Sequence, residues 1–159
     1  MTRQVLIPQA SSSVITAWAR LLRAHASATR ELSAQLQSEH GLSINDYECL
    51  LALSHADQCG VRRVDLAGEL LLTPSGVTRL LDGLQDAGYV CKGTCSTDAR
   101  VSYAVLTDEG YEKLRTAAPD HVGSIRELFG EHFSSDELET LRELLGRLPA
   151  DPARTECEP

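Results

Sequence analysis

Residues 72–81 read LTPSGVTRLL, and this stretch decides the fold of the chain. Thr73 is a good helix N-cap, and Pro74 suits the first helical turn, where a missing N–H does no harm. Apolar residues then recur at i, i+3, i+4 and i+7, a spacing that predicts one buried stripe. The stripe comprises Val77, Leu80, Leu81 and Leu84.

The opposite face of this helix is small and polar. It carries Ser75, Thr78, Arg79, Asp82 and Gln85. Side chains of this kind can reach base edges and phosphates in the major groove of DNA. An ordinary amphipathic surface helix has the same periodicity, so the helix alone leaves both interpretations open.

The neighbouring sequence favours a winged helix-turn-helix. An apolar run over residues 64–71 predicts a short helix, and the tight turn that joins it to the quoted helix makes a helix-turn-helix. Residues 89–92 and 101–106 then read as two strands. Their connection, residues 93–100, is rich in small and polar residues and predicts a hairpin with an extended tip, which is a wing.

Helices also flank this centre. Ser11 to Ser13 can cap a long helix that ends at Gly41, and its apolar seam alternates steps of four and three residues. The seam comprises Trp18, Leu22, His25, Thr29, Leu32 and Leu36. After the wing, Thr107 caps a second long helix, and a capping box that begins at Ser134 starts a final leucine-rich helix.

This order of elements predicts a mainly α fold with a small β-hairpin wing (α+β), a winged helix-turn-helix between N- and C-terminal dimerisation helices. We expect a single domain over residues 1–159. Within it, residues 11–42 and 108–148 form the dimerisation helices, residues 43–107 the DNA-binding lobe and residues 149–159 a flexible tail. Leucine stripes that a small centre cannot cover usually mark a partner, so we expect a homodimer.

The formal net charge of −8 opposes DNA binding, because duplex DNA repels an acidic surface. The charge is segregated, however. Residues 60–107 hold five basic and five acidic side chains, and most of the acidity follows residue 107. Five basic residues per subunit are few, so we expect DNA binding to need two copies of the lobe.

Other function classes have little support. Aromatic residues make up only 4% of the chain, too few for the stacking surface of a single-strand binder. The chain has neither an apolar run long enough to span a bilayer nor a secretory signal, so we expect a cytoplasmic protein without a membrane partner. No catalytic motif stands out, and we expect neither enzyme activity nor a cofactor.

Several motifs occur in a characteristic order: SGVTRL at 75–80, then Leu84, GYV at 88–90, DAR at 98–100 and LTDEG at 106–110. Together they resemble the MarR family of bacterial transcriptional regulators, over about Val14 to Leu148. The resemblance implies a winged-helix homodimer that binds a palindromic operator in double-stranded DNA, usually as a repressor.

The resemblance also implies roles for single residues. The quoted helix would lie in the major groove and the wing along the minor groove. Arg100 would reach the minor groove or its phosphates, and Asp98 would hold the wing or orient that arginine. A solvated hairpin tip is the alternative for both. The expected DNA-binding set is Arg62, Thr73, Ser75, Gly76, Thr78, Arg79, Lys92, Asp98 and Arg100.

Members of this family are commonly released from DNA by small, often aromatic acids. Trp18, Leu22 and His25 share one seam of the first helix, which we expect to face the junction with the DNA-binding lobe, near Tyr47. A donor or cationic side chain beside aromatic surface suits a phenolic carboxylate. The alternative is a dimer-core role for Trp18 and a structural role for His25.

A thiol switch is a rival hypothesis. Cys91 and Cys95 flank the first turn of the wing, so their oxidation would distort the element that touches DNA. The chain has five cysteines without a tight framework spacing, and free incidental thiols are the alternative.

A metal switch needs clustered ligands. Glu39, His40, His121 and His132 qualify only if folding brings them together, and none forms a pair at HxxxH or CxxC spacing. We therefore expect no metal site. A winged-helix dimer that serves as a protein-interaction module without DNA binding is the alternative function, and the acidic net charge supports it.

Overall fold

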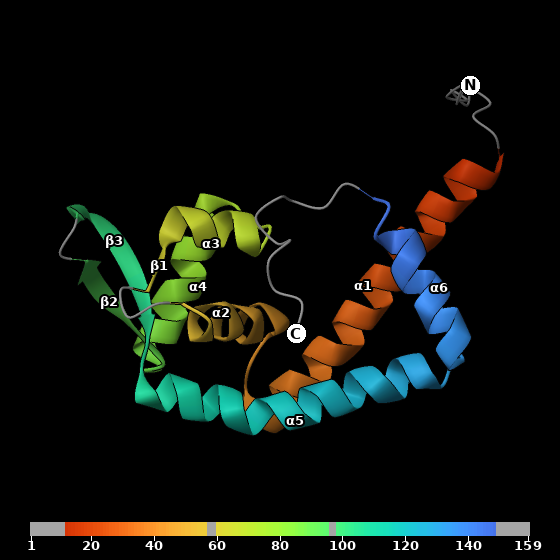
Figure 1. The fold of residues 1–159 in the computed structure, drawn as a ribbon. Helices are drawn as coiled ribbons and strands as arrows, with labels where there is room; N and C mark the ends of the chain where they lie inside the picture. The colour runs from red at the N-terminus through yellow and green to blue at the C-terminus, as the bar shows by residue number, and fades with distance from the viewer. Residues whose placement is uncertain (1–11, 57–59, 96–97, 149–159) are drawn as a thin grey trace, which may run out of the picture.

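The structure is a computed structural model and describes residues 12–56, 60–95 and 98–148 (Figure 1). The elements follow in the order α1 (Ser12–His40), α2 (Ile44–Ser54), β1 (Val61–Arg62), α3 (Arg63–Glu69), α4 (Pro74–Asp86), β2 (Val90–Cys95), β3 (Asp98–Leu106), α5 (Asp108–Gly130) and α6 (Ser135–Leu145). This order confirms the predicted mainly α fold with a β-hairpin wing. In the described ranges, no helix is both long enough and apolar enough to cross a membrane.

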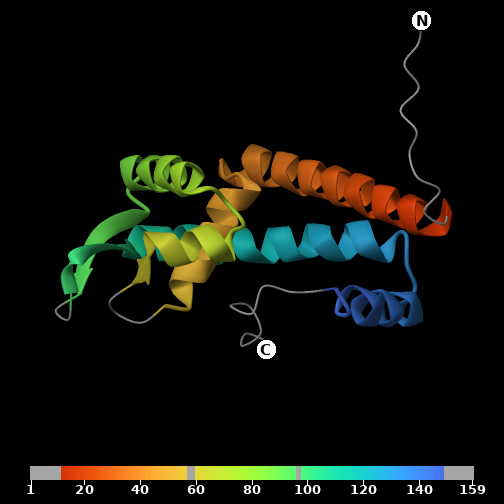
Figure 2. The ribbon, with the colours of Figure 1, turned by 90° about the horizontal axis from the view of Figure 1, so that it is seen from above.

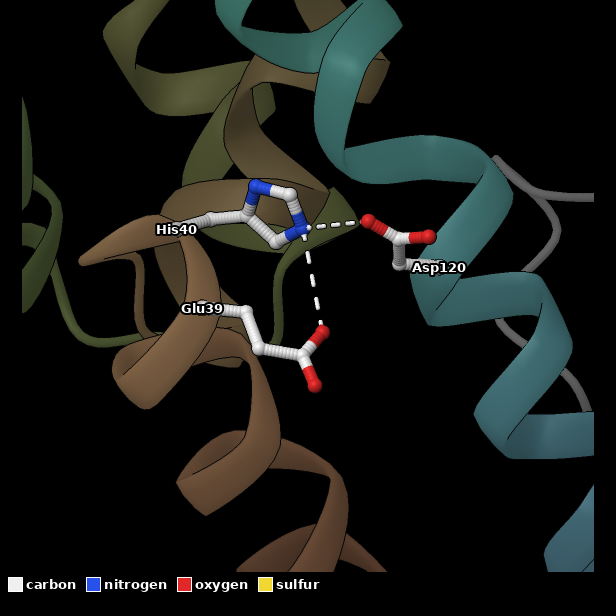
Figure 3. Close-up of side chains that lie close together, drawn as sticks. All are labelled: Glu39, His40 and Asp120. Atoms are coloured by element: carbon white, nitrogen blue, oxygen red, sulfur yellow. Dashed lines mark hydrogen bonds and ion pairs between the residues drawn. The ribbon is translucent and has the colours of Figure 1, made fainter.

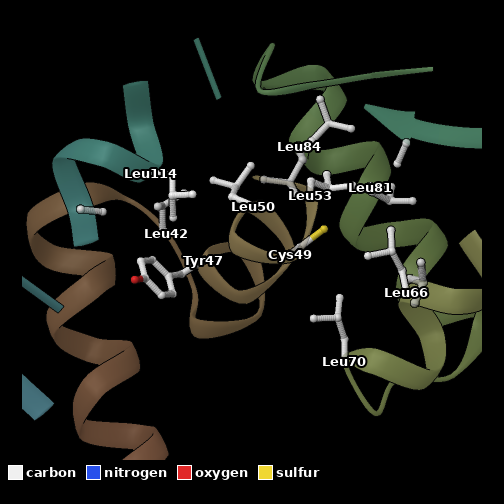
Figure 4. Close-up of a cluster of buried hydrophobic side chains, with 14 of the residues drawn as sticks. Leu42, Tyr47, Cys49, Leu50, Leu53, Leu66, Leu70, Leu81, Leu84 and Leu114 are labelled. Carbon is white, nitrogen blue, oxygen red and sulfur yellow. The ribbon is translucent and has the colours of Figure 1, made fainter. Parts of the chain in front are cut away.

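One hydrophobic core holds the lobe together (Figure 4). The predicted stripe of α4 lies in it, with Val77, Leu81 and Leu84 buried. Helix α2 contributes Leu50 and the free thiol of Cys49, both fully buried. Each fully buried leucine stabilises the fold by about 1.5–3 kcal/mol relative to an exposed one, so this core carries much of the stability of the lobe.

The sheet has three antiparallel strands in the order β1-β3-β2. Strands β2 and β3 extend further than predicted, because Cys95 pairs with Asp98 and little remains of the expected 93–100 connection. The small polar residues of that segment indicated a loop. A ladder needs only backbone hydrogen bonds, however, and it continues there across an irregularity between Gly93 and Cys95.

The start of α5 packs tightly against the start of the wing. A Cβ atom on Gly110 would collide with the carbonyl oxygen of Tyr89, so only glycine permits this approach. Thr107 caps α5 by accepting a hydrogen bond from Gly110 N at 3.0 Å, and its hydroxyl donates to Gly88 O at 2.8 Å. These contacts join the end of α4, the wing and α5. They explain why threonine and glycine stand at positions 107 and 110 of the LTDEG motif.

Helices α1 and α5 extend away from the lobe. Figure 1 shows the C-terminal end of α1 crossing α5, and there Leu32 and Leu36 are buried. The N-terminal half of α1 has no such cover, since Trp18 is 57% exposed. Helix α6 has no buried residues, and Figure 2 shows it apart from α1.

Candidate nucleic-acid interface

The polar face of α4 is presented to solvent as predicted. Thr73 accepts a hydrogen bond from Gly76 N at 3.1 Å, which caps the helix. The exposed side chains of this face are those of Ser75, Thr78, Arg79 and Asp82. The N-terminus of α4 therefore offers small hydroxyl groups and a guanidinium group, while the buried stripe anchors the helix in the lobe.

Arg79 is the cation of this face. None of the ion pairs among the described residues involves it, so its guanidinium group is available to an external acceptor. Gly76 lies beside the cap of α4, and its predicted role in DNA binding stays a prediction. A Cβ there would lie 3.2 Å from Thr73 Oγ1, so glycine at this position protects the cap of α4.

Arg62 is engaged by a neighbouring carboxylate. Its Nε and Nη2 donate to Asp65 at 2.6 and 2.9 Å, and this bidentate hydrogen bond raises the pKa of Arg62. Both side chains are about half exposed. A phosphate would have to compete with Asp65 for this arginine, so the predicted role of Arg62 in DNA binding stays a prediction.

The wing lies at the same end of the molecule as α4 (Figure 1). Lys92 is exposed on β2, where it pairs with Ala104 of β3. The side chains of Asp98 and Arg100 lie outside the described residues, so their predicted roles in DNA binding stay predictions.

The predicted effector residues do not form one cluster within the chain. Trp18, Leu22 and His25 lie exposed on the N-terminal half of α1, whereas Tyr47 is buried in the core of the lobe. Trp18 precedes Leu36, the α1 residue in the core around Tyr47, by 18 positions, which is about 27 Å of helix. Nothing in one chain brings Trp18 to Tyr47.

The cysteines differ in their surroundings. Cys49 is fully buried, and this burial, with smaller contributions from Asp46 and Glu69, raises its pKa to about 12. Cys49 is therefore an inert thiol. Cys91 is exposed on β2, and the side chain of Cys95 lies outside the described residues.

A buried histidine, His121, lies between α5 and α2. It is only 4% exposed, its ring lies 4.5 Å from that of Tyr47 at a tilt of 57°, and its Nδ1 has no hydrogen-bond partner among the described residues. Burial lowers the pKa of His121, and the charge of Glu48 opposes this in part. The burial of His121 could have been predicted from the sequence, because Leu114, Ala117 and His121 are spaced at i, i+3 and i+7 and so lie on one face of α5.

Comparisons with known proteins agree with this geometry. A profile of the MarR family matches residues 40–101. The HTH-type transcriptional regulator MhqR of Bacillus subtilis (strain 168) is 27% identical over 128 residues, which cover 80% of this chain and 86% of MhqR.

Two regulators from Streptomyces coelicolor have similar structures. Sco3205, a MarR family transcriptional regulator solved in complex with DNA, matches with a TM-score of 0.79 at 26% identity, over 92% of this chain and 95% of Sco3205. AbsC, also a MarR family transcriptional regulator, matches with a TM-score of 0.77 at 31% identity, over 87% of this chain and 93% of AbsC. With a capped polar helix, a wing and this degree of similarity, the chain belongs to the MarR family of transcriptional regulators and is a DNA-binding protein.

Proposed function

We propose that this protein is a homodimeric repressor that binds a palindromic operator in double-stranded DNA and is released from it by a small ligand. The observation that carries the proposal is the exposed face of α4, which presents the hydroxyl groups of Ser75 and Thr78 and the guanidinium of Arg79, a group in none of the ion pairs among the described residues. In a major groove such a face reads sequence through short polar contacts and one strong cation contact.

The charge distribution supports binding by two lobes rather than one. Within the lobe, residues 60–107 are neutral by count, since they carry five basic and five acidic side chains, whereas residues 43–59 add three acidic side chains and no lysine or arginine. Affinity from phosphate neutralisation grows with the number of contacts made, and a dimer doubles that number. A two-fold dimer also favours a palindromic site, because each half-site then meets the same recognition helix.

The exposed apolar side chains of the outer helices support a homodimer. On α1 and after α5 they are Val14, Ile15, Trp18, Leu22, Phe133, Leu144, Leu145 and Leu148, each at least 39% exposed. Helix α6 has a full capping box yet buries no residue in its own chain. An apolar surface of this kind on a small protein is typical of an interface with another protein, and a second copy supplies the matching surface.

The test of DNA binding begins with the selection of duplexes from a random library by the purified full-length protein. We expect a palindromic consensus and an affinity that falls steeply with salt. Arg79→Ala should weaken binding to the selected duplex by at least about tenfold, since a good base or phosphate contact contributes about 1–3 kcal/mol in each subunit.

Arg115→Ala is the matched control, because Arg115 is an exposed arginine of α5, not of α4, and it pairs with Glu112. It should leave the affinity unchanged. Equal affinities of the wild type, Arg79→Ala and Arg115→Ala would refute the assignment of α4 as the reading helix. Failure to select any duplex at low salt would favour the protein-interaction module instead.

The ligand part of the proposal rests on Trp18 and His25, which share one face of α1 with the side chains of the proposed dimer interface, so that the ligand would bind at that interface. A phenolic acid can stack on the indole and accept a hydrogen bond from the imidazole. In a thermal-shift screen of phenolic acids, we expect stabilisation that is lost in His25→Ala and that accompanies release from DNA. Release by peroxide that is lost in Cys91→Ser or Cys95→Ser would favour the thiol switch instead.

A further inference from the structure

Three side chains that commonly bind metal ions meet where α1 crosses α5 (Figure 3). Glu39 and His40 end α1, and Asp120 lies in α5, 80 residues after His40. His40 Nε2 lies 3.0 Å from Asp120 Oδ2 and 4.0 Å from Glu39 Oε2. These atoms all lie within 4.8 Å of one another, so folding builds a cluster that sequence spacing does not reveal.

The cluster combines a fixed nitrogen with accessible oxygens. The side chain of His40 is only 9% exposed, which holds its ring in place, whereas those of Glu39 and Asp120 are 50% and 57% exposed. Figure 3 shows Nε2 of the ring facing both carboxylates. Glu39 is oriented in turn by Gln35, whose Nε2 donates to Glu39 Oε2 at 2.5 Å. An ion and its water ligands can therefore enter from the open side without displacing the imidazole.

The donor set fits a divalent transition-metal ion. One neutral imidazole and two carboxylates carry a charge of −2 together and are ligands that Zn²⁺ accepts at about 2.0–2.2 Å. Ligand atoms in tetrahedral coordination at that bond length lie about 3.3–3.6 Å apart. The His40–Asp120 separation of 3.0 Å would have to widen by about 0.3–0.6 Å, and the exposed Glu39 carboxylate needs a shift of only about 1 Å. A water molecule would complete four-fold coordination.

The surrounding surface favours cations as well. A cavity of about 290 Å³ lies along the same α1–α5 contact, and Glu31, Glu127 and Glu131 contribute to its lining. Gln35 belongs to both this cavity and the cluster, and its buried Oε1 has no hydrogen-bond partner among the described residues. A recess lined by one sign of charge raises the local concentration of counter-ions.

We propose that Glu39, His40 and Asp120 bind one divalent transition-metal ion per chain, with Zn²⁺ as the preferred ion. The ion replaces the hydrogen that links His40 Nε2 to Asp120, and the imidazole remains neutral with its proton on Nδ1. It then ties the last turn of α1 to the middle of α5. That turn leads directly into the lobe, because Gly41 ends α1 and Ser43 caps α2.

The test is a titration of the metal-free, full-length protein with Zn²⁺ in competition with a chromogenic chelator. We expect one ion per chain and a rise in the thermal midpoint. His40→Ala and Asp120→Asn should each weaken the affinity by more than about tenfold, since the loss of even an outer partner of a ligand typically does so. His132→Ala is the control, because His132 is an exposed histidine outside the cluster, and it should bind as the wild type does.

Two further measurements keep the test decisive. Asp120→His places a second imidazole beside His40 and should keep the affinity within about tenfold of the wild type, which separates loss of a ligand from loss of structure. The second measurement is the absorption spectrum of the protein with Co²⁺ bound. We expect no thiolate-to-metal charge-transfer band, because the proposed ligands are nitrogen and oxygen atoms.

Unchanged affinity in both His40→Ala and Asp120→Asn would overturn the proposal, as would a thiolate band that disappears in Cys91→Ser. No DNA is present in these measurements. Their failure would therefore leave the proposed operator binding intact, and failure of operator binding would leave the metal site intact.

Discussion

A neutral imidazole is buried between α2 and α5 at His121. Its ring packs against Tyr47 and its Nδ1 has no partner in the described part of the chain. Protonation would place a charge in a largely desolvated position, and this burial is the physical reason for the lowered pKa of His121, although the charge of Glu48 opposes it in part. We therefore expect this residue to make the contact between the lobe and α5 sensitive to acid.

The first prediction concerns the pH dependence of stability. Because the folded-state pKa of His121 lies below the unfolded value of 6.5, the unfolded chain takes up a proton that the native protein excludes. The contribution of neutral His121 is complete above about pH 6.5 and is lost as the pH falls below it, by at most about 1.4 kcal/mol per pH unit.

Urea unfolding at about pH 7.5 and about pH 5 measures this loss. We expect His121→Gln to lose less stability than the wild type between the two values, since glutamine does not titrate. His132→Gln should behave as the wild type does, because His132 is exposed. An identical pH dependence in His121→Gln and the wild type would contradict the prediction.

At the scale of elements, three helices are followed by a residue in the left-handed conformation, but this residue is not the same in all three. Helices α1 and α4 end with Gly41 and Gly88, at φ angles of 64° and 79°. Helix α3 ends with Leu71 at a φ of 53°, where Leu71 N donates to Gly68 O and Leu72 N to Ala67 O. This pair of hydrogen bonds is a Schellman motif, in which glycine is the favoured residue.

The second prediction is that Leu71→Gly stabilises the protein. A left-handed conformation destabilises the native state by about 1–2 kcal/mol for a non-glycine residue, and Leu71→Gly removes this cost. The greater flexibility of glycine in the unfolded chain lowers the free energy of unfolding by about 0.5–1 kcal/mol and offsets part of the gain. Leu71 is 74% exposed, so little buried surface is lost. We expect a net gain of about 0.5–1 kcal/mol in the free energy of unfolding, measured with urea. A loss of stability would show that the leucine side chain packs favourably in the turn.

The third prediction compares two glycines within α4. Gly83 is exposed and a Cβ there would meet open space, so Gly83→Ala should stabilise the protein by about 1 kcal/mol through helix propensity. Gly76→Ala should gain less or lose stability, because its Cβ would press on the capping hydroxyl of Thr73. Equal effects of the two substitutions in urea unfolding would refute the role given to Gly76.

At the scale of the whole molecule, the long helices α1 and α5 and the short helix α6 extend from the lobe. The lobe leaves much of their surface uncovered. Their apolar side chains face outward on α1 and α6, and Figure 2 shows these helices well apart. A packed core cannot form between helices that do not meet in one chain. The proposed second copy of the chain would cover both helices at once.

The fourth prediction is that charges on these helices break the dimer. Leu22→Asp on α1 and Leu145→Asp on α6 each place a carboxylate on the proposed interface, where an unpaired buried charge is strongly unfavourable. We expect sedimentation equilibrium to show a dimer for the wild type and a monomer, or a much weaker dimer, for these variants. Val64→Asp is the control, since Val64 is 69% exposed on α3, away from both helices. A monomeric wild type would contradict the proposal.

Much of the fold was predictable because its signals are local. Thr73, Thr107 and Ser134 cap the helices that they were predicted to cap, and the stripe that includes Val77 faces the core. The wing was predicted in kind but not in extent, since side-chain composition does not report how far a backbone ladder continues. The face of α4 was predictable too, because a helix of known phase has a known exposed side.

The sequence by itself determined the helices, their caps, their apolar faces and the polar face of α4, because each depends on residues within about one or two helical turns of one another. Only the tertiary structure decided which faces are covered. The crossing of α1 and α5 buries Leu36, leaves Trp18 exposed and brings Asp120 to His40 across 80 residues. The packing of α5 on α2 sets His121 against Tyr47. Such contacts depend on where and how two helices cross, and no spacing along either helix encodes that crossing.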